Sequence, residues 1–288
     1  MSIIETALSR HRRPEGAGKV ASASAFPPAS VATRPKISIP VELLRERGAY
    51  PPAETEASVL EQFRRVKRSL LRLVEADLKA GGTRVPIVVT SANQGDGKTF
   101  CSIGLALSLA LEQDFSVVLI DGDPYVRATS AAFGVADRPG FLDLASNASI
   151  DPESLIVETD RPGLLVLPAG ATSPLASELA ASERARDLLA RIGGGDSRRI
   201  LILDCPPLLA TTEALSHATR GAHVMLILRD GQTPRHSVDM ALDTLAQDAP
   251  DARVSLVLNH ARASAEDRYY EYGAYGSVRP SPSKEAGQ

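Results

Sequence analysis

The 288-residue chain has no tryptophan, five histidines and only two cysteines, Cys101 and Cys205. Both cysteines stand in apolar stretches, and the histidines are scattered without the spacing of metal ligands. The sequence therefore indicates neither a disulfide framework nor a zinc site, and we expect two reduced, buried thiols.

Long apolar runs and an excess of charge are also missing. The longest apolar run, 103–111, has nine residues, whereas a membrane-spanning helix needs about 20. The basic residues at the N-terminus follow its apolar stretch, which is the reverse of the order in a secretory signal. A net charge of −3 gives no general attraction to nucleic acid. We therefore expect a cytoplasmic protein that acts outside the bilayer and without nucleic acid.

Composition divides the chain into four parts. Residues 1–13 are expected to form a short helix, because Ser2 and Glu5 have capping-box spacing. Residues 14–55 begin with a stretch rich in Ala, Ser, Pro and Gly and predict a flexible linker, with at most a helical turn near its end. Residues 56–262 predict one folded domain, and the polar segment 263–288 predicts a disordered tail.

The folded domain alternates between two patterns. Apolar runs rich in β-branched residues occur at 85–90, 117–121, 164–168, 200–204, 223–228 and 254–259. Most connections between them are long enough for a helix. Near-continuous apolar strands separated by helices predict an α/β fold with a mostly parallel sheet and helices on both faces. In such sheets ligands bind beyond the carboxyl ends of the strands.

The stretch VVTSANQGDGKTF, residues 88–100, matches the phosphate loop G-x-x-x-x-G-K-[ST], except that Ala92 replaces the first glycine. Gly95 and Gly97 allow backbone N–H groups to converge on anionic oxygens at the start of a helix. Lys98 adds positive charge for the phosphates, and Thr99 adds a hydroxyl for Mg²⁺. The residues expected to contact the nucleotide are Ala92, Asn93, Gln94, Gly95, Asp96, Gly97, Lys98, Thr99 and Phe100.

Three carboxylates end two other strands of the predicted sheet. Asp204 closes the run RILILD and looks like a Walker B acid that orients the Mg²⁺ shell. Asp121 and Asp123 end the run VVLIDGD and face the same way, because side chains alternate along a strand. Asp123 lies further out and is the better candidate for a general base. Thr99, Asp121 and Asp204 are the expected metal ligands, and Lys98, Asp121, Asp123 and Asp204 the expected catalytic residues.

Together these motifs resemble a known family. TSANQGDGKT, VLIDGDP and LILDCPPLL are similar to the Walker A, Walker A′ and Walker B motifs of the bacterial tyrosine kinases, the BY-kinases. EQFRRVK resembles their Glu-x-x-Arg-x-x-Arg oligomerisation helix, with Glu61, Arg64 and Lys67 at the three positions. The tail resembles their tyrosine cluster, with Tyr269, Tyr270, Tyr272 and Tyr275. MSIIETAL and DCPPLLATTEA look more narrowly like the exosortase-associated (PEP-CTERM locus) tyrosine autokinases.

The resemblance implies an ATP- and Mg²⁺-dependent protein-tyrosine autokinase. Such a kinase phosphorylates the tyrosine cluster of a neighbouring copy in a homo-oligomer and regulates exopolysaccharide synthesis and export. Its implied partners are a separate membrane chain-length regulator of the polysaccharide co-polymerase type, which acts as activator, and a cognate tyrosine phosphatase. The implied location is cytoplasmic and peripheral at the inner membrane through that regulator.

Two other functions remain open at this point. A partitioning or septum-positioning ATPase has the same fold but carries a signature lysine early in the loop, where this chain has Asn93. A nucleotide-binding adaptor without kinase activity is the other alternative. It is kept open because the turn after Asp123 departs from the family pattern and places its arginine at Arg127.

Overall fold

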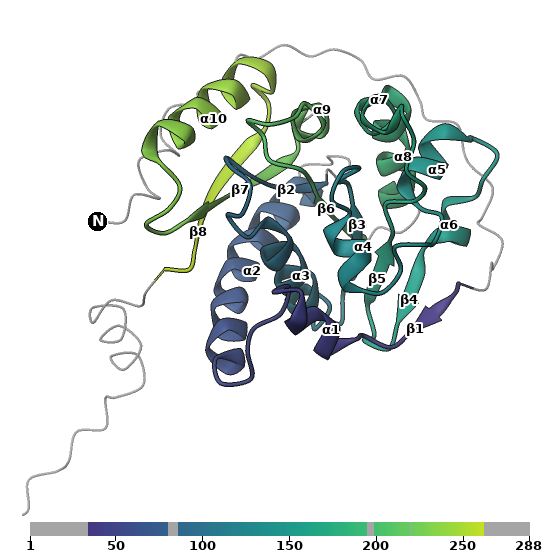
Figure 1. The fold of residues 1–288 in the computed structure, drawn as a ribbon, viewed down its shortest axis with the longest axis horizontal. Helices are drawn as coiled ribbons and strands as arrows, with labels where there is room; N and C mark the ends of the chain where they lie inside the picture. Colours follow the sequence, from purple (N-terminus) through teal and green to yellow (C-terminus); the bar gives the residue numbers. More distant parts are fainter. Residues whose placement is uncertain (1–33, 80–85, 195–198, 220, 262–288) are drawn as a thin grey trace, which may run out of the picture.

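The computed structural model describes residues 34–79, 86–194, 199–219 and 221–261 (Figure 1). In chain order the elements are β1 (Lys36–Ile37), α1 (Val41–Glu46), α2 (Glu56–Lys79), β2 (Ile87–Ser91), α3 (Lys98–Leu109), β3 (Ser116–Asp121), α4 (Ala128–Ala132), α5 (Phe141–Ser146), α6 (Pro152–Leu155), β4 (Val157–Thr159), β5 (Leu164–Leu167), α7 (Ala176–Ala181), α8 (Glu183–Gly194), β6 (Arg199–Asp204), α9 (Glu213–Ala218), β7 (His223–Arg229), α10 (Arg235–Asp248) and β8 (Arg253–Asn259). The expected N-terminal helix and the tyrosine-bearing tail lie outside the described residues.

The described strands form one eight-stranded sheet in the order β1-β4-β5-β3-β6-β2-β7-β8. Neighbouring strands are parallel except β4 and β5, which are antiparallel. All six strands expected from the apolar runs are present, which confirms the predicted α/β fold with a mostly parallel sheet. The two strands not predicted, β1 and β4, have only two and three residues, too few to give a recognisable apolar run.

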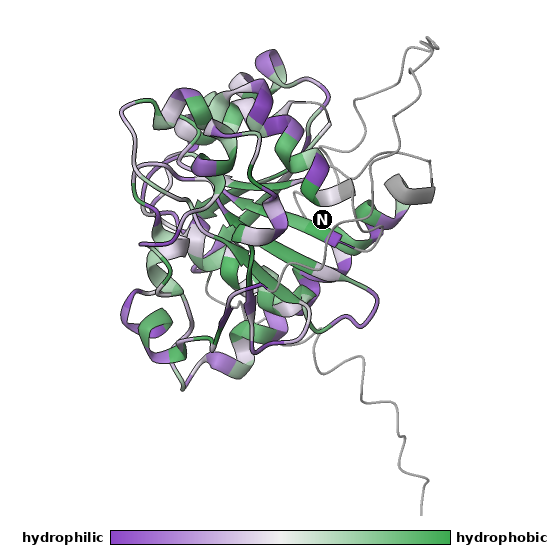
Figure 2. Cartoon of the chain, turned by 90° about the vertical axis from the view of Figure 1, so that its right-hand side faces the viewer, coloured by the Kyte–Doolittle hydropathy of each residue, from purple (hydrophilic) through white to green (hydrophobic). Residues whose placement is uncertain are grey.

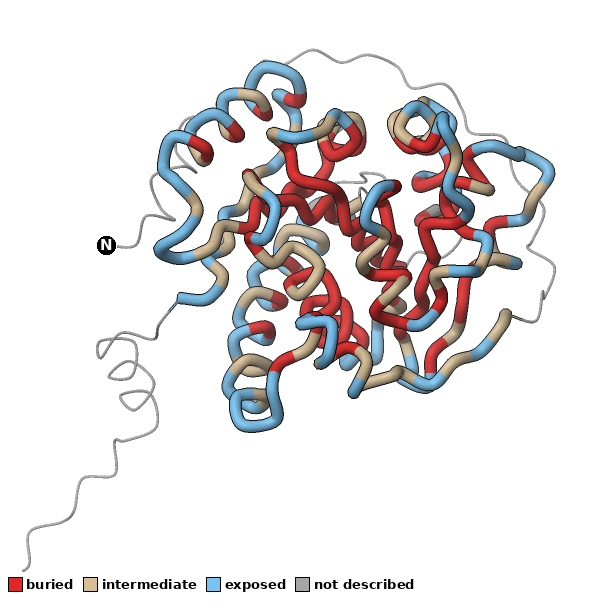
Figure 3. The backbone as a smooth tube through the Cα atoms, viewed as in Figure 1, coloured by how far each residue is buried: buried red, intermediate tan, exposed pale blue. Residues whose placement is uncertain are grey.

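Helices cover both faces of the sheet (Figure 1). Helices α1 to α4 pack on one face, and α5, α8, α9 and α10 pack on the other. The central strands β2, β3 and β6 are almost wholly buried, as the colours of Figure 3 show. They are also apolar over most of their length (Figure 2). Burial on both faces explains why these strands show continuous apolar runs rather than alternation.

Helix α2 packs its apolar stripe against α3, the helix that starts at the phosphate loop. Phe63 and Leu70 are buried on that stripe, and the ring of Phe63 lies 5.8 Å from the ring of Phe100. A Cβ atom at Gly104 would lie 2.2 Å from the Phe63 ring. Only glycine therefore permits this close approach of α2 to α3. Within the described ranges, every helix is too short or too polar to cross a membrane.

The folded domain begins earlier than the sequence indicates. Residues 34–55, expected to belong to a flexible linker, carry the edge strand β1 and the helix α1. Lys36 pairs with Glu158 of β4, and Leu44 is fully buried against the α2–α3 side of the core. The helical turn expected near the end of this segment is confirmed as α1. The apolar residues that anchor the segment are too widely spaced in the sequence to show a period.

Candidate active site

The loop between β2 and α3 has the geometry of a phosphate loop. Gly95 and Gly97 have φ of 89° and 93°, which side-chain-bearing residues rarely adopt. Helix α3 begins immediately after, at Lys98. Inside the loop, the Ser91 hydroxyl donates to the Asn93 carbonyl at 2.6 Å. The expected strand, glycine loop and helix are therefore all present.

Two other strands support this loop from their carboxyl ends. The Thr233 hydroxyl, beyond β7, donates to Asp96 Oδ1 at 2.7 Å. The side-chain amide of Asn259, the last residue of β8, donates to the Asp96 carbonyl at 3.0 Å. The guanidinium of Arg229 donates to the Gly95 carbonyl at 3.3 Å. The sequence interpretation missed these residues, although their positions at strand ends are the same signal that identified the acids.

Asp96 itself has a structural role in the loop. Its side chain is buried, and its second carboxylate oxygen accepts from the Asn93 N–H at 3.0 Å. Both oxygens are therefore engaged within the protein. Of the other expected nucleotide contacts, Ala92 is buried and the Phe100 side chain packs against the core, whereas Gln94 and Gly95 are exposed. Because the side chains of Asp96 and Phe100 are engaged within the protein, these two residues would contact a nucleotide through their backbone N–H groups.

The ammonium group of Lys98 lies 3.7 Å from Asp123 Oδ2. Asp123 is 2% exposed, and its other oxygen accepts from the N–H groups of Tyr125 and Val126 at 3.0 and 2.9 Å. Oδ2 is buried without a hydrogen-bond partner among the described residues. One carboxylate oxygen thus holds the loop after β3, and the other faces Lys98.

Asp121 and Asp204 lie side by side at the ends of β3 and β6, where they are paired in the sheet register. Asp121 accepts from the N–H and hydroxyl of Ser130 at 2.7 and 2.6 Å. Asp204 accepts from Ser102 at 3.1 Å and from Thr129 at 2.8 Å. Burial, and then the charge of Asp204, raises the pKa of Asp121 to about 7. Burial also raises the pKa of Asp204, although the charge of Lys98 opposes the shift.

These residues fit a magnesium ion that also has phosphate and water ligands. In the described ranges no three His, Cys, Asp or Glu residues form a metal cage. Mg²⁺ usually takes one or two carboxylates and completes its shell with water and substrate phosphates. Asp204, with the carboxylate of Asp123 close by, matches that requirement, and Thr99 at the start of α3 can add a hydroxyl. Asp121, whose oxygens already accept bonds from Ser130 and the Asp123 N–H, is less free to act as a ligand.

A second group of polar residues borders the loop after Asp123. The Tyr125 hydroxyl donates to Glu213 Oε1 at 2.6 Å, and the Ser177 hydroxyl donates to the same oxygen. Glu213 is fully buried on α9. Burial raises the pKa of Glu213, but the hydrogen bonds from Ser177 and Tyr125 outweigh it and leave the pKa lowered. This network joins three segments at the rim of the site, and sequence patterns did not predict it.

Arg127, whose role the sequence left open, caps helix α4. It has a left-handed backbone with φ of 53°, and its guanidinium donates to the Ala136 carbonyl. The arginine therefore braces the segment that follows Asp123.

The expected oligomer contacts separate into two groups. Glu61 and Arg64 form an ion pair of 2.7 Å on the surface of α2. Lys67 is 8% exposed, and its ammonium lies 2.6 Å from Glu112, which follows α3. Lys67 thus contacts its own domain, and the oligomer contact remains a prediction. The four tail tyrosines lie outside the described residues.

No protein-family model matches the chain. Among curated proteins it is similar to the tyrosine-protein kinase CpsD of Streptococcus agalactiae, with 27% identity over 190 residues, which is 66% of this chain and 81% of CpsD. It is 25% identical over 235 residues to the tyrosine-protein kinase YwqD of Bacillus subtilis, covering 81% of this chain and 92% of YwqD. Among solved structures, the VpsO kinase domain matches with 27% identity and a TM-score of 0.58, over 77% of this chain and 97% of that domain.

The parallel sheet, the glycine loop and the strand-end acids define a phosphate-loop nucleotide-binding fold. Within that class, the chain is similar to bacterial tyrosine-protein kinases, which agrees with the resemblance of its motifs. The narrower resemblance to exosortase-associated autokinases stays a prediction.

Proposed function

We propose that this chain is an ATP- and Mg²⁺-dependent protein-tyrosine kinase that phosphorylates its own C-terminal tyrosines, Tyr269, Tyr270, Tyr272 and Tyr275, in another copy of itself. The observation that carries the proposal is the unpartnered Asp123 oxygen, 3.7 Å from the Lys98 ammonium at the mouth of the phosphate loop. A carboxylate beside a phosphate site can accept the proton of an attacking hydroxyl.

The roles of the loop residues follow from charge. Phosphoryl transfer depends on positioning and charge neutralisation more than on covalent chemistry. The N–H groups at Gly95 and Gly97 and the start of α3 would bind phosphate oxygens. Lys98 would neutralise charge on the transferred group, and bound Mg²⁺ would neutralise the remainder. Thr99 and Asp204 would hold the ion and its waters, which leaves the unpartnered Asp123 oxygen free to accept a proton.

Asp123 would remove the proton from the acceptor phenol as its oxygen bonds to the terminal phosphorus. A free tyrosine has a pKa of about 10 and is mostly neutral at pH 7, so a base assists the attack. The two backbone donors on the other Asp123 oxygen fix the carboxylate in place. Asp121, bonded to Ser130, would keep the loop after β3 in the shape that presents Asp123.

The cellular setting is also part of the proposal. The family resemblance supports a cytoplasmic role in exopolysaccharide synthesis and export, next to a membrane chain-length regulator that activates the kinase. It likewise supports a homo-oligomer, with Glu61 and Arg64 on the exposed face of α2 as contact residues, and a cognate phosphatase that reverses the reaction.

The test incubates the purified chain with Mg-ATP, with and without the cytoplasmic segment of the regulator, and probes for phosphotyrosine. Lys98→Met and Asp123→Asn are expected to abolish the signal. Replacing all four tail tyrosines with phenylalanine should remove most of it, whereas Tyr50→Phe, a matched change next to α2, should retain it. ATP hydrolysis without phosphotyrosine would favour a partitioning ATPase, and binding without turnover would favour an adaptor.

A further inference from the structure

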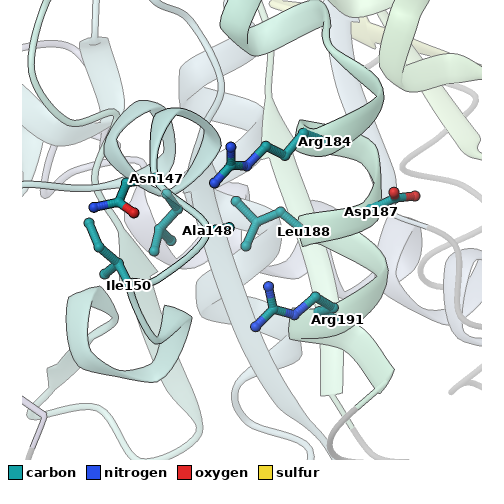
Figure 4. Close-up of a pocket in the computed structure, with 8 residues that line it drawn as sticks. Asn147, Ala148, Ile150, Arg184, Asp187, Leu188 and Arg191 are labelled. Carbon is teal, nitrogen blue, oxygen red and sulfur yellow. The ribbon is translucent and has the colours of Figure 1, made fainter. Parts of the chain in front are cut away.

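A cavity of about 380 Å³ lies between α8 and the segment that joins α5 to α6. Its apolar wall comes from Leu144, Ile150 and Leu188, and two arginines of α8, Arg184 and Arg191, stand at its rim (Figure 4). None of these residues belongs to the phosphate site. The combination of an apolar wall and two cations defines the chemistry of whatever binds there.

The two arginines are free to bind a ligand. Arg184, Leu188 and Arg191 are spaced by four and three residues, so they share one face of the helix. Both guanidinium groups point toward the cavity in Figure 4, whereas the carboxylate of Asp187 points away from it. Neither arginine forms a hydrogen bond or ion pair with another described residue, and both are exposed. Arg186, on another face, is by contrast bonded to Ala181 and Glu183.

We propose that this cavity binds phosphotyrosine, and that its occupant is the phosphorylated C-terminal segment of this chain around Tyr270 and Tyr272. The proposal rests on the proposed kinase function, which supplies the phosphotyrosine. A phosphate group carries about −1.5 to −2 charges and offers several acceptor oxygens. Guanidinium groups bind such oxygens in bidentate pairs. Ala148 and Ile150, the more exposed apolar residues of the lining, then contact the aromatic ring, which an isolated phosphate lacks.

The spacing of the two tyrosines suits the two arginines. In an extended segment, residues two apart point to the same side and are separated by roughly 6.7 Å. Arg184 and Arg191 are seven residues apart, a distance of about 10 Å along the helix axis. Their long side chains can lean toward each other to match the shorter spacing of the two tyrosines. Two phosphotyrosines on one side of the segment would thus each meet one arginine, with Leu188 between them.

The length of the chain beyond the described residues permits this contact. Tyr270 lies nine residues beyond Ala261, and nine extended residue steps span about 30 Å. Strand β8 lies five strand positions from β5, or about 24 Å across the sheet, and the cavity lies on the β5–β6 side of the core. The tail is therefore long enough to cross the width of the sheet between β8 and β5, toward a cavity on its own domain or on an adjacent one.

The test measures binding of a synthetic peptide of residues 266–276, phosphorylated at Tyr270 and Tyr272, to the full chain by fluorescence anisotropy without ATP. The double variant R184Q/R191Q is expected to bind at least tenfold more weakly than the unmodified chain. R47Q/R235Q removes the same charge at two exposed arginines elsewhere and is expected to bind normally. Thermal melting confirms that both variants are folded.

Three results would overturn the proposal: equal affinity for the unphosphorylated peptide, equal affinity for a peptide with glutamate at both positions, or equal losses in the two double variants. Because the phosphopeptide is synthetic, the result is independent of kinase activity. A chain that binds the peptide but makes no phosphotyrosine would contradict only the proposed function. One that makes phosphotyrosine but fails to bind would contradict only the cavity.

Discussion

The side-chain amide of Asn259 donates to the carbonyl of Asp96 at 3.0 Å, so the last strand of the sheet holds the phosphate loop across 163 residues of sequence. Gly97, the next residue, leaves room for this amide. A Cβ atom there would lie 2.1 Å from Asn259 Nδ2. The loop and the end of β8 therefore form one structural unit, and nucleotide binding depends on both.

Asn259→Ala is expected to weaken nucleotide binding by about 2- to 10-fold, because one hydrogen bond contributes about 0.5–1.5 kcal/mol. Calorimetric titration with ADP and Mg²⁺ measures the effect. Asn147→Ala, a change at the end of α5 remote from the loop, is the control and should bind normally. Equal affinities in the unmodified chain and Asn259→Ala would show that the loop keeps its shape without β8.

Gly97→Ala is expected to weaken binding by more than tenfold, because it combines an unfavourable φ of 93° with a collision against Asn259. Gly95→Ala shares the positive φ of 89° but has open space around it, so it isolates the backbone strain. The double variant G97A/N259A should recover part of the lost affinity. If it recovers none, the collision is not the cause.

Tyr125→Phe is expected to lower kcat by roughly 3- to 10-fold with little change in KM for ATP, because it removes a donor to buried Glu213 and loosens the loop behind Asp123. An exogenous tyrosine peptide serves as acceptor, so that the loss of Tyr125 as a possible phosphorylation site does not change the measured rate. Tyr50→Phe removes a comparable bond to Glu56 far from the site and is the control. A fall in ATP affinity at unchanged kcat would contradict the assigned role.

His217→Leu is expected to change how stability depends on pH. Burial, with a contribution from the charge of Arg186, lowers the pKa of His217 from its usual 6.5 to about 4. The unfolded chain therefore takes up a proton that the folded chain rejects. Stability from the neutral imidazole is fully present above pH 6.5 and is lost as the pH falls toward 4.

The corresponding measurement compares urea unfolding at pH 7.5 and pH 5. Between these values the free energy of unfolding of His217→Leu should rise relative to that of the unmodified chain by about 2 kcal/mol. Groups common to both proteins cancel in this difference, including Asp121, whose raised pKa acts in the opposite direction. An identical pH dependence in the two proteins would show that His217 takes up its proton equally in the folded and the unfolded chain, which contradicts the lowered pKa.

The central sheet and the phosphate loop were predictable because their signals are local. Continuous apolar runs identified the buried strands, and Gly95, Gly97 and Lys98 follow one of those runs directly. The acids at the ends of β3 and β6 were predictable from topology, since carboxyl ends of parallel strands share an edge. The structure places Asp123 beside Lys98, as this reasoning requires.

The contacts that failed to appear in the sequence interpretation join distant segments. Thr233 and Asn259 reach Asp96 only after β7 and β8 have paired, and no local pattern marks them. Asp96 and Lys67 carry charges that composition assigns to the surface, yet both are buried with partners. The local sequence does not distinguish a charged residue that is buried beside a partner from one that is exposed.

The edge strand β1 has a practical consequence. Lys36 and Ile37 pair with the outer edge of β4, and Leu44, which follows them in α1, is fully buried. A recombinant protein truncated to start at residue 56 would lack all three residues. It would uncover the core surface under Leu44 and leave the backbone groups of β4 open to pairing with another molecule. Truncation at residue 33 would instead retain the whole edge, and it is the boundary at which a shortened kinase domain should stay monodisperse.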